Sequence, residues 1–135
     1  MYKETCKVLV VDDERDTADT AVILLHLWGH EAEAAYSAED ALSKAFTLDP
    51  DVVLVDLVMP EVSGFDLAKE LRRVCPAAKF LATTGFTQTD IVRRSREAGF
   101  AKVLFKPAPA RVLKEAVDGE CADTAPEPRL RTRTS

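Results

Sequence analysis

Acidic, hydroxyl and lysine side chains follow four short apolar runs of this chain, at the point where each run ends. These residues are Asp12, Asp13, Asp56, Thr84 and Lys106. In sheets of parallel strands, ligands bind outside the carboxyl ends of the strands. If the runs are strands of one such sheet, three carboxylates, a hydroxyl and an ammonium group meet at one edge of it.

Three carboxylates at one edge of a sheet have a defined chemistry. Neighbouring strands lie about 4.8 Å apart, so Asp12, Asp13 and Asp56 must lie close together and repel one another. A divalent cation with oxygen ligands, such as Mg²⁺, compensates this repulsion. Together with Lys106 it makes the pocket formally neutral and able to accept a phosphoryl group. A carboxylate that attacks phosphorus forms an aspartyl phosphate, and the cations stabilise the transferring oxygens.

The apolar runs alternate with longer segments of helical periodicity. The runs are Cys6–Val11, Glu31–Ala35, Val52–Val55, Lys79–Thr83 and Lys102–Phe105. Two of them, Val8–Val11 and Val52–Val55, are continuous and rich in β-branched residues, as expected of strands buried on both faces of a parallel sheet. This (βα)₅ alternation predicts an α/β fold with a doubly wound, five-stranded parallel sheet and helices on both faces.

Glycine, proline and capping residues set the expected helix limits. Ser37 with Asp40 is a capping-box pattern, and Gly29 and Gly99 follow expected helix ends. The predicted helices cover residues 16–28, 37–48, 65–74, 89–98 and 110–118. We expect one domain over residues 1–121 and a flexible tail over 122–135, where apolar periodicity is lost. His26 and His30 are expected on the exposed side and at the end of the first helix.

Composition limits the other possibilities. A net charge of -5 argues against broad nucleic-acid binding. The three cysteines, Cys6, Cys75 and Cys121, are odd in number and widely spaced, which predicts unpaired thiols in a reducing compartment instead of a disulfide or a metal site. The first apolar run is too short for a signal peptide or a membrane span, so we expect a cytoplasmic protein.

Four segments, in order and in register, resemble the signature motifs of response-regulator receiver domains of the CheY-like superfamily. They are VLVVDDE at 8–14, VLVDLVMPEVSG at 53–64, ATTGF at 82–86 and FKP at 105–107. The resemblance covers about residues 6 to 120. It implies a flavodoxin-like strand order, 2-1-3-4-5, which periodicity alone does not give.

The resemblance also assigns roles to the residues at the sheet edge. Asp56 becomes the phosphoacceptor, Thr84 the hydroxyl that turns toward the phosphoryl group, and Lys106 the partner of the phosphate. Thr83 competes for the hydroxyl role, but Gly85 directly after Thr84 matches the small residue of the motif. Mg²⁺, or Mn²⁺ in its place, is expected to bind Asp13, Asp56 and the backbone carbonyl of Val58 directly. Asp12 is expected to act through a metal-bound water.

Auxiliary positions follow from the same resemblance. Met59 and Pro60 shape the loop after the acceptor, Gly64 permits the turn into the next helix, and the Lys106–Pro107 bond is expected to be cis. Val103 replaces the aromatic residue that many receivers have three positions before the lysine, which puts an aromatic relay in doubt. Val58 and Phe86 should flank the path of a hydrolytic water that neither can orient, which predicts slow dephosphorylation.

The function implied is a phosphoacceptor switch and not a turnover enzyme. The expected phosphoryl donor is a sensor histidine kinase or a histidine phosphotransfer protein. Output is expected through contact with an unknown protein, and we expect no direct binding to nucleic acids or membranes. The chain is expected to be a monomer or a weak homodimer. A stand-alone regulator, a relay intermediate and a receiver excised from a hybrid kinase all remain open. The other classes weighed are an aspartyl-phosphate phosphatase, a flavin-binding module and a receiver that is never phosphorylated. The first would carry its nucleophile on the first strand, usually in a DxD motif, whereas here the two aspartates of that strand are adjacent and the lone Asp56 follows the third strand. The second would have a phosphate-binding loop where this chain has DDERD.

Overall fold

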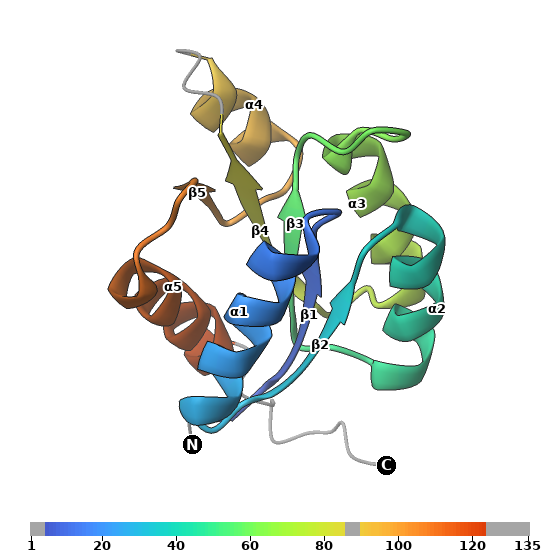
Figure 1. The fold of residues 1–135 in the computed structure, drawn as a ribbon. Coiled ribbons are helices and arrows are strands. Elements are labelled where there is room, and N and C mark those ends of the chain that lie inside the picture. Colours follow the sequence, from blue (N-terminus) through green and yellow to red (C-terminus); the bar gives the residue numbers. More distant parts are fainter. Residues whose placement is uncertain (1–4, 86–89, 124–135) are drawn as a thin grey trace.

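The computed structural model describes residues 5–85 and 90–123. Five parallel strands form one sheet in the order β2-β1-β3-β4-β5 (Figure 1). The strands are β1 (Lys7–Val11), β2 (Glu31–Ala35), β3 (Val52–Asp56), β4 (Lys79–Thr84) and β5 (Lys102–Phe105). The helices are α1 (Arg15–Leu27), α2 (Ala38–Leu48), α3 (Gly64–Val74), α4 (Ile91–Glu97) and α5 (Ala110–Asp123). The predicted fold class and strand order are therefore confirmed.

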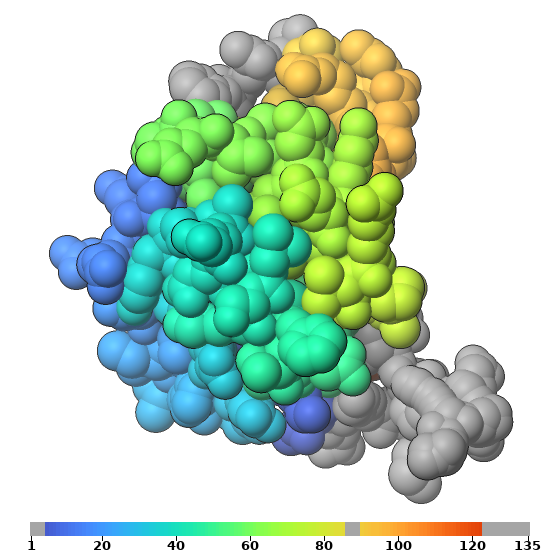
Figure 2. All heavy atoms as spheres, turned by 90° about the vertical axis from the view of Figure 1, so that its right-hand side faces the viewer, coloured from blue at the N-terminus to red at the C-terminus, as the bar shows by residue number. Residues whose placement is uncertain are grey.

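Helices cover both faces of the sheet, so the central strands are buried on both sides. In β1 and β3, Leu9 and Val53 belong to the core formed with α2, α3 and α4. Their neighbours Val8 and Val52 belong to the core formed with α1 and α5. Figure 2 shows the first of these faces, where the side chains of α2 and α3 form a continuous surface over the sheet. This two-sided burial explains why both strands are uninterrupted apolar runs.

Strand register brings the predicted site residues to one edge. Val11 pairs with Val55, so the residues that follow β1 lie beside Asp56 at the end of β3. Asp56 in turn pairs with Thr83 on β4, and Thr84 pairs with Phe105, the residue before Lys106. The sheet thus aligns the carboxyl ends of four strands.

Most helix limits agree with the sequence, but the end of α5 does not. Ser37 caps α2 as predicted, since its Oγ accepts a hydrogen bond from the amide of Asp40 at 3.1 Å. Helix α5 was expected to end near Gly119, whereas it continues to Asp123. A glycine inside a helix costs only about 1 kcal/mol, and burial of Cys121 beyond it outweighs that cost. Residues 124–135 of the predicted tail lie outside the described residues.

Two expectations about residues near the start of β1, at the end of the sheet opposite the acidic residues, were wrong. Cys6 and Cys121 form a disulfide, because the start of β1 and the end of α5 meet there, with Cα atoms 5.9 Å apart. His30 is buried, since it hydrogen-bonds to both of these elements. His26 is exposed, and Cys75 is a buried unpaired thiol, both as expected. Among the described helices, none combines the length and the apolar character that a membrane span needs.

Candidate functional site

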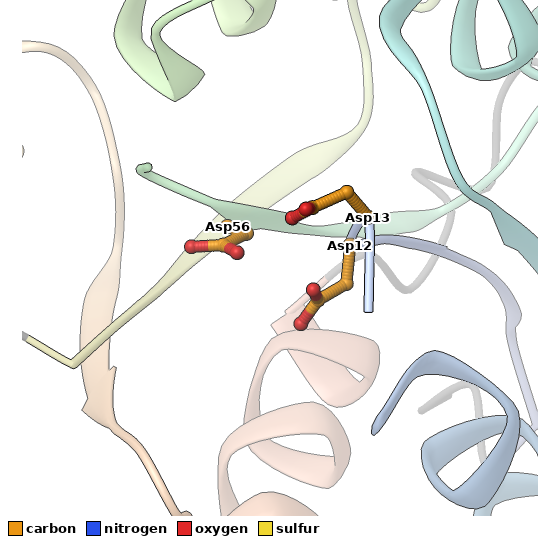
Figure 3. A group of neighbouring side chains, drawn as sticks. All are labelled: Asp12, Asp13 and Asp56. Atoms are coloured by element: carbon orange, nitrogen blue, oxygen red, sulfur yellow. The ribbon is translucent and has the colours of Figure 1, made fainter. Parts of the chain in front are cut away.

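The three predicted carboxylates come together at the carboxyl ends of β1 and β3 (Figure 3). One carboxylate oxygen from each of Asp12, Asp13 and Asp56 lies within 4.8 Å of the others. Asp12 and Asp56 are buried, and Asp13 is exposed. Residues 44 positions apart in the chain thus form one acidic cluster, because they lie at the carboxyl ends of two neighbouring central strands.

Backbone amides hold the two buried carboxylates in place. Asp12 Oδ1 accepts a hydrogen bond from the amide of Glu14 at 2.9 Å, and its own amide donates to the carbonyl of Ala35 at 3.0 Å. Asp56 Oδ1 accepts from the amide of Val58 at 3.1 Å. One oxygen of each side chain is therefore bound by its own loop, and the other oxygen faces the centre of the site.

Lys106 lies between these two inward-facing oxygens. Its Nζ is 2.9 Å from Asp12 Oδ2 and 3.0 Å from Asp56 Oδ2. The Lys106–Pro107 peptide bond is cis, as predicted. The amide of Lys106 donates to the carbonyl of Thr84 at 2.8 Å, which ties the loop after β5 to the end of β4. The loop after β5 thus places an ammonium group against the acidic cluster at the ends of β1 and β3.

The charges of the site are only partly balanced. Burial raises the pKa of Asp56, and the Val58 amide and Lys106 offset this effect only in part. Burial lowers the pKa of Lys106, but its hydrogen bonds to Asp12 and Asp56 more than compensate and leave the pKa raised. Three carboxylates face one ammonium group, so the site carries an excess of negative formal charge. Oxygen donors with such an excess suit a hard divalent cation.

Both threonines at the end of β4 are buried, and they differ in position. Thr83 pairs with Asp56 and borders the same cleft as Asp12 and Lys106. Thr84 is fully buried, and its carbonyl accepts from the amide of Lys106. The structure brings both hydroxyl candidates to the correct edge, and the preference for Thr84 stays a prediction.

Comparison with known proteins agrees with this geometry. The sequence profile of the response regulator receiver domain matches residues 8–118. The chain belongs to this family. It is 35% identical, over 108 residues, to a response regulator receiver protein of Anaeromyxobacter sp. strain Fw109-5, covering 79% of this chain and 45% of that protein. It is 32% identical, over 110 residues, to the chemotaxis protein CheY of Thermotoga maritima, covering 80% and 92% of the two chains.

Solved receiver structures have the same architecture. The chemotaxis protein CheY4 of Vibrio cholerae superposes with a TM-score of 0.79 at 27% identity, covering 85% of this chain and 98% of that one. A CheY-like receiver domain protein of Methanospirillum hungatei JF-1 gives 0.80 at 25% identity, covering 87% and 94%. Family membership argues against the phosphatase and flavin-binding alternatives.

The loop after the acceptor fits a receiver, and the contacts of Gly64 give a physical reason for a glycine at the turn into α3. A Cβ on Gly64 would clash with the carbonyl oxygen of Asp56 and lie 2.6 Å from Leu57 Cα. Glycine is needed here because α3 begins against the backbone of the acceptor, and no left-handed turn is involved. Met59 is buried in the core, and Pro60 is exposed beside Asp13.

The remaining auxiliary residues differ in how far they are exposed to solvent. Val103 is partly buried against the core under α2, α3 and α4. Gly85 and Pro107 are exposed, and the Val58 side chain is half-exposed. Phe86 lies outside the described residues. Coordination by the carbonyl of Val58 stays a prediction.

The structure also has a cleft of about 520 Å³ beside the receiver site, which the sequence did not predict. Asp12 and Lys106 border it, Thr17 and Leu24 of α1 form one wall, and Leu113 of α5 contributes to the other. Its existence depends on the spacing between two helices far apart in the chain. No local pattern in the sequence reports that spacing.

Proposed function

We propose that this receiver domain is a signalling switch that accepts a phosphoryl group onto Asp56 in a reaction that requires Mg²⁺. The observation that carries the proposal is the position of Asp56, 3.0 Å from Lys106 Nζ and within 4.8 Å of Asp12 and Asp13. The donor is a phosphohistidine of a sensor kinase or phosphotransfer protein. An Asp56 oxygen bonds to phosphorus as the bond from phosphorus to the histidine nitrogen breaks.

The chain's own residues divide this work among them. Asp12, Asp13 and Asp56, with the carbonyl of Val58, would hold Mg²⁺ or Mn²⁺, which supplies positive charge to the transferring oxygens. The amide of Val58 orients the Asp56 carboxylate. Lys106, now shared between Asp12 and Asp56, moves its hydrogen bond to a phosphoryl oxygen, and Thr84 donates its hydroxyl to another.

We infer the wider role by analogy with the family. The domain catalyses its own phosphorylation and its own slow dephosphorylation. It acts in the cytoplasm as a monomer or weak homodimer, and phosphorylation changes its contacts with an output protein. Its aligned segment makes up 45% of the Anaeromyxobacter relative. A stand-alone regulator, a relay intermediate and a receiver of a hybrid kinase are all compatible with the chain.

Labelling with acetyl phosphate tests the acceptor directly. We expect wild type to gain about 80 Da, one phosphoryl group, when Mg²⁺ is present and not when it is chelated. Asp56→Asn should gain nothing because an amide cannot form the acyl phosphate. The matched control is Asp66→Asn, which changes an exposed aspartate of α3. An equal mass gain in Asp56→Asn would refute the proposal.

The half-exposed Val58 side chain leads to a prediction about the lifetime of the phosphorylated form. Valine cannot hydrogen-bond to an attacking water, so we expect a lifetime of minutes or longer at neutral pH. Val58→Asn should shorten it by about threefold or more, because an amide can orient that water. The lifetimes of the phosphorylated wild type and of phosphorylated Val58→Asn are measured from the loss of the 80 Da mass increase over time, after removal of the donor. Val92→Asn, at an exposed valine of α4, should leave the lifetime unchanged, and a wild-type lifetime of seconds would contradict the prediction.

A further inference from the structure

A covalent bond joins the two ends of the described fold, far from the phosphoacceptor. Cys6 directly precedes β1 and Cys121 lies in the last turns of α5, 115 residues later. Both side chains are almost fully buried. Since Asp12 and Asp13 follow the carboxyl end of β1, the disulfide and the acidic cluster lie at opposite ends of the same strand. Figure 1 shows the start of β1 and the last turns of α5 at the same end of the sheet.

Hydrogen bonds join the same two elements independently of the disulfide. His30 Nδ1 accepts from the amide of Cys6 at 3.0 Å. This leaves the proton on Nε2, which lies 3.0 Å from Asp118 Oδ1 on α5. Lys114 Nζ donates to the other oxygen of Asp118 at 2.8 Å. None of these contacts requires the sulfur–sulfur bond, so we expect the reduced chain to keep its fold while α5 loses its covalent attachment.

The compartment expected for a receiver makes this bond unusual. Glutathione and thioredoxin keep cytosolic thiols reduced, and disulfides found there are usually transient or redox-sensing. Cys75 provides an internal contrast, because its buried thiol donates to the carbonyl of Leu71 and burial raises its pKa to about 11. Such a thiol yields little thiolate and is inert. Cys75 is also unpaired, so among the three cysteines it is the pair at the β1–α5 junction that can form a disulfide within the chain.

We propose that Cys6 and Cys121 are a redox-reversible pair that controls how firmly the C-terminal turns of α5 are attached to β1. Oxidation uses a small disulfide such as oxidised glutathione. One cysteine thiolate attacks it and releases one glutathione thiol, and the second cysteine thiolate then attacks the mixed disulfide and releases another. The two cysteines lose two electrons and two protons to the two glutathione thiols, and a dithiol reverses the reaction.

Burial of the two sulfur atoms limits the rate of thiol–disulfide exchange, and the helix that contains Cys121 also borders the cleft beside the phosphoacceptor. Neither sulfur can be attacked until the last turns of α5 open, which a helix end does at lower cost than global unfolding. At its other end, α5 supplies Leu113 to the cleft bordered by Asp12 and Lys106. One helix thus connects the redox pair with the cleft beside the phosphoacceptor site. The redox pair itself does not depend on phosphorylation of Asp56.

Counting thiols in wild-type protein tests whether the pair forms. The native protein is incubated with oxidised glutathione or with a dithiol, then unfolded in an alkylating reagent and weighed. We expect one alkylated cysteine, Cys75, after oxidation and three after reduction, with full interconversion. Three alkylated cysteines after oxidation, or stable glutathione adducts, would overturn the proposal.

Hydrogen exchange tests whether the pair controls α5. In the reduced form, amides of residues 114–123 should exchange about tenfold or more faster than in the oxidised form. The oxidised form should also melt roughly 10–15 °C higher, since the bond closes a loop longer than 100 residues. Cys121→Ser should match reduced wild type under both conditions, and Cys75→Ser should respond as wild type does. Equal exchange of α5 in reduced and oxidised wild type would refute control of the helix, whether or not any variant folds.

Discussion

Replacing Gly64 with alanine is expected to destabilise the domain by about 2–4 kcal/mol and to displace Asp56 from the site. The new Cβ would clash with the Asp56 carbonyl oxygen and with Leu57 Cα, and both are backbone atoms that cannot rotate away. The amide of Gly64 donates to the Leu57 carbonyl at 2.9 Å, and Val58 pairs with Ser63, so the whole loop must shift. Urea unfolding measures the first effect, and the rate of acetyl phosphate labelling measures the second.

Gly119→Ala is the matched control, because the same chemical change should have the opposite sign. Gly119 lies inside α5, and a Cβ there would meet no described atom within 4 Å. Alanine favours a helix interior over glycine by about 0.5–1 kcal/mol, so stability should rise slightly. A Gly64→Ala protein as stable as wild type would show that α3 does not need this close approach to the acceptor strand.

The site could be predicted from the sequence because it depends on strand ends. Asp12 and Asp56 each come directly after an uninterrupted apolar run, and such runs are typical of central strands in a parallel sheet. Two neighbouring central strands bring their carboxyl ends together whatever the details of packing. The strand order needed the family resemblance in addition, since periodicity does not say which strands are neighbours.

The opposite end of the sheet could not be predicted, because its contacts depend on where α5 ends. Gly119 has the local pattern of a helix end, but a helix that stopped there would leave Cys121 unplaced. Packing between distant segments extends α5, and that extension brings Cys121 to Cys6. The contact between Asp118 and His30 also joins segments far apart in the chain. Neither pair has a sequence spacing that distinguishes it from chance.

Removing the Lys106 ammonium group is expected to change metal binding and phosphorylation in opposite directions. In Lys106→Ala, the carboxylates of Asp12 and Asp56 lose a positive charge 2.9 and 3.0 Å away. The same charge repels a divalent cation, so Mg²⁺ should bind about tenfold more tightly, as measured by calorimetry. Labelling by acetyl phosphate at saturating Mg²⁺ should slow by about 100-fold or more, because a charged donor to the transferring oxygens is lost.

The stability of the same variant separates the two roles of the lysine. Without metal, Lys106→Ala leaves buried carboxylates unpaired and should lower stability by about 2–3 kcal/mol. Mg²⁺ should restore part of this loss, because it binds only the folded state. Lys102→Ala, at an exposed lysine of β5, the strand that precedes Lys106, should change none of these quantities. If Mg²⁺ affinity falls together with the labelling rate, Lys106 acts mainly by holding the acidic side chains in position, and the charge-balance account of the site is wrong.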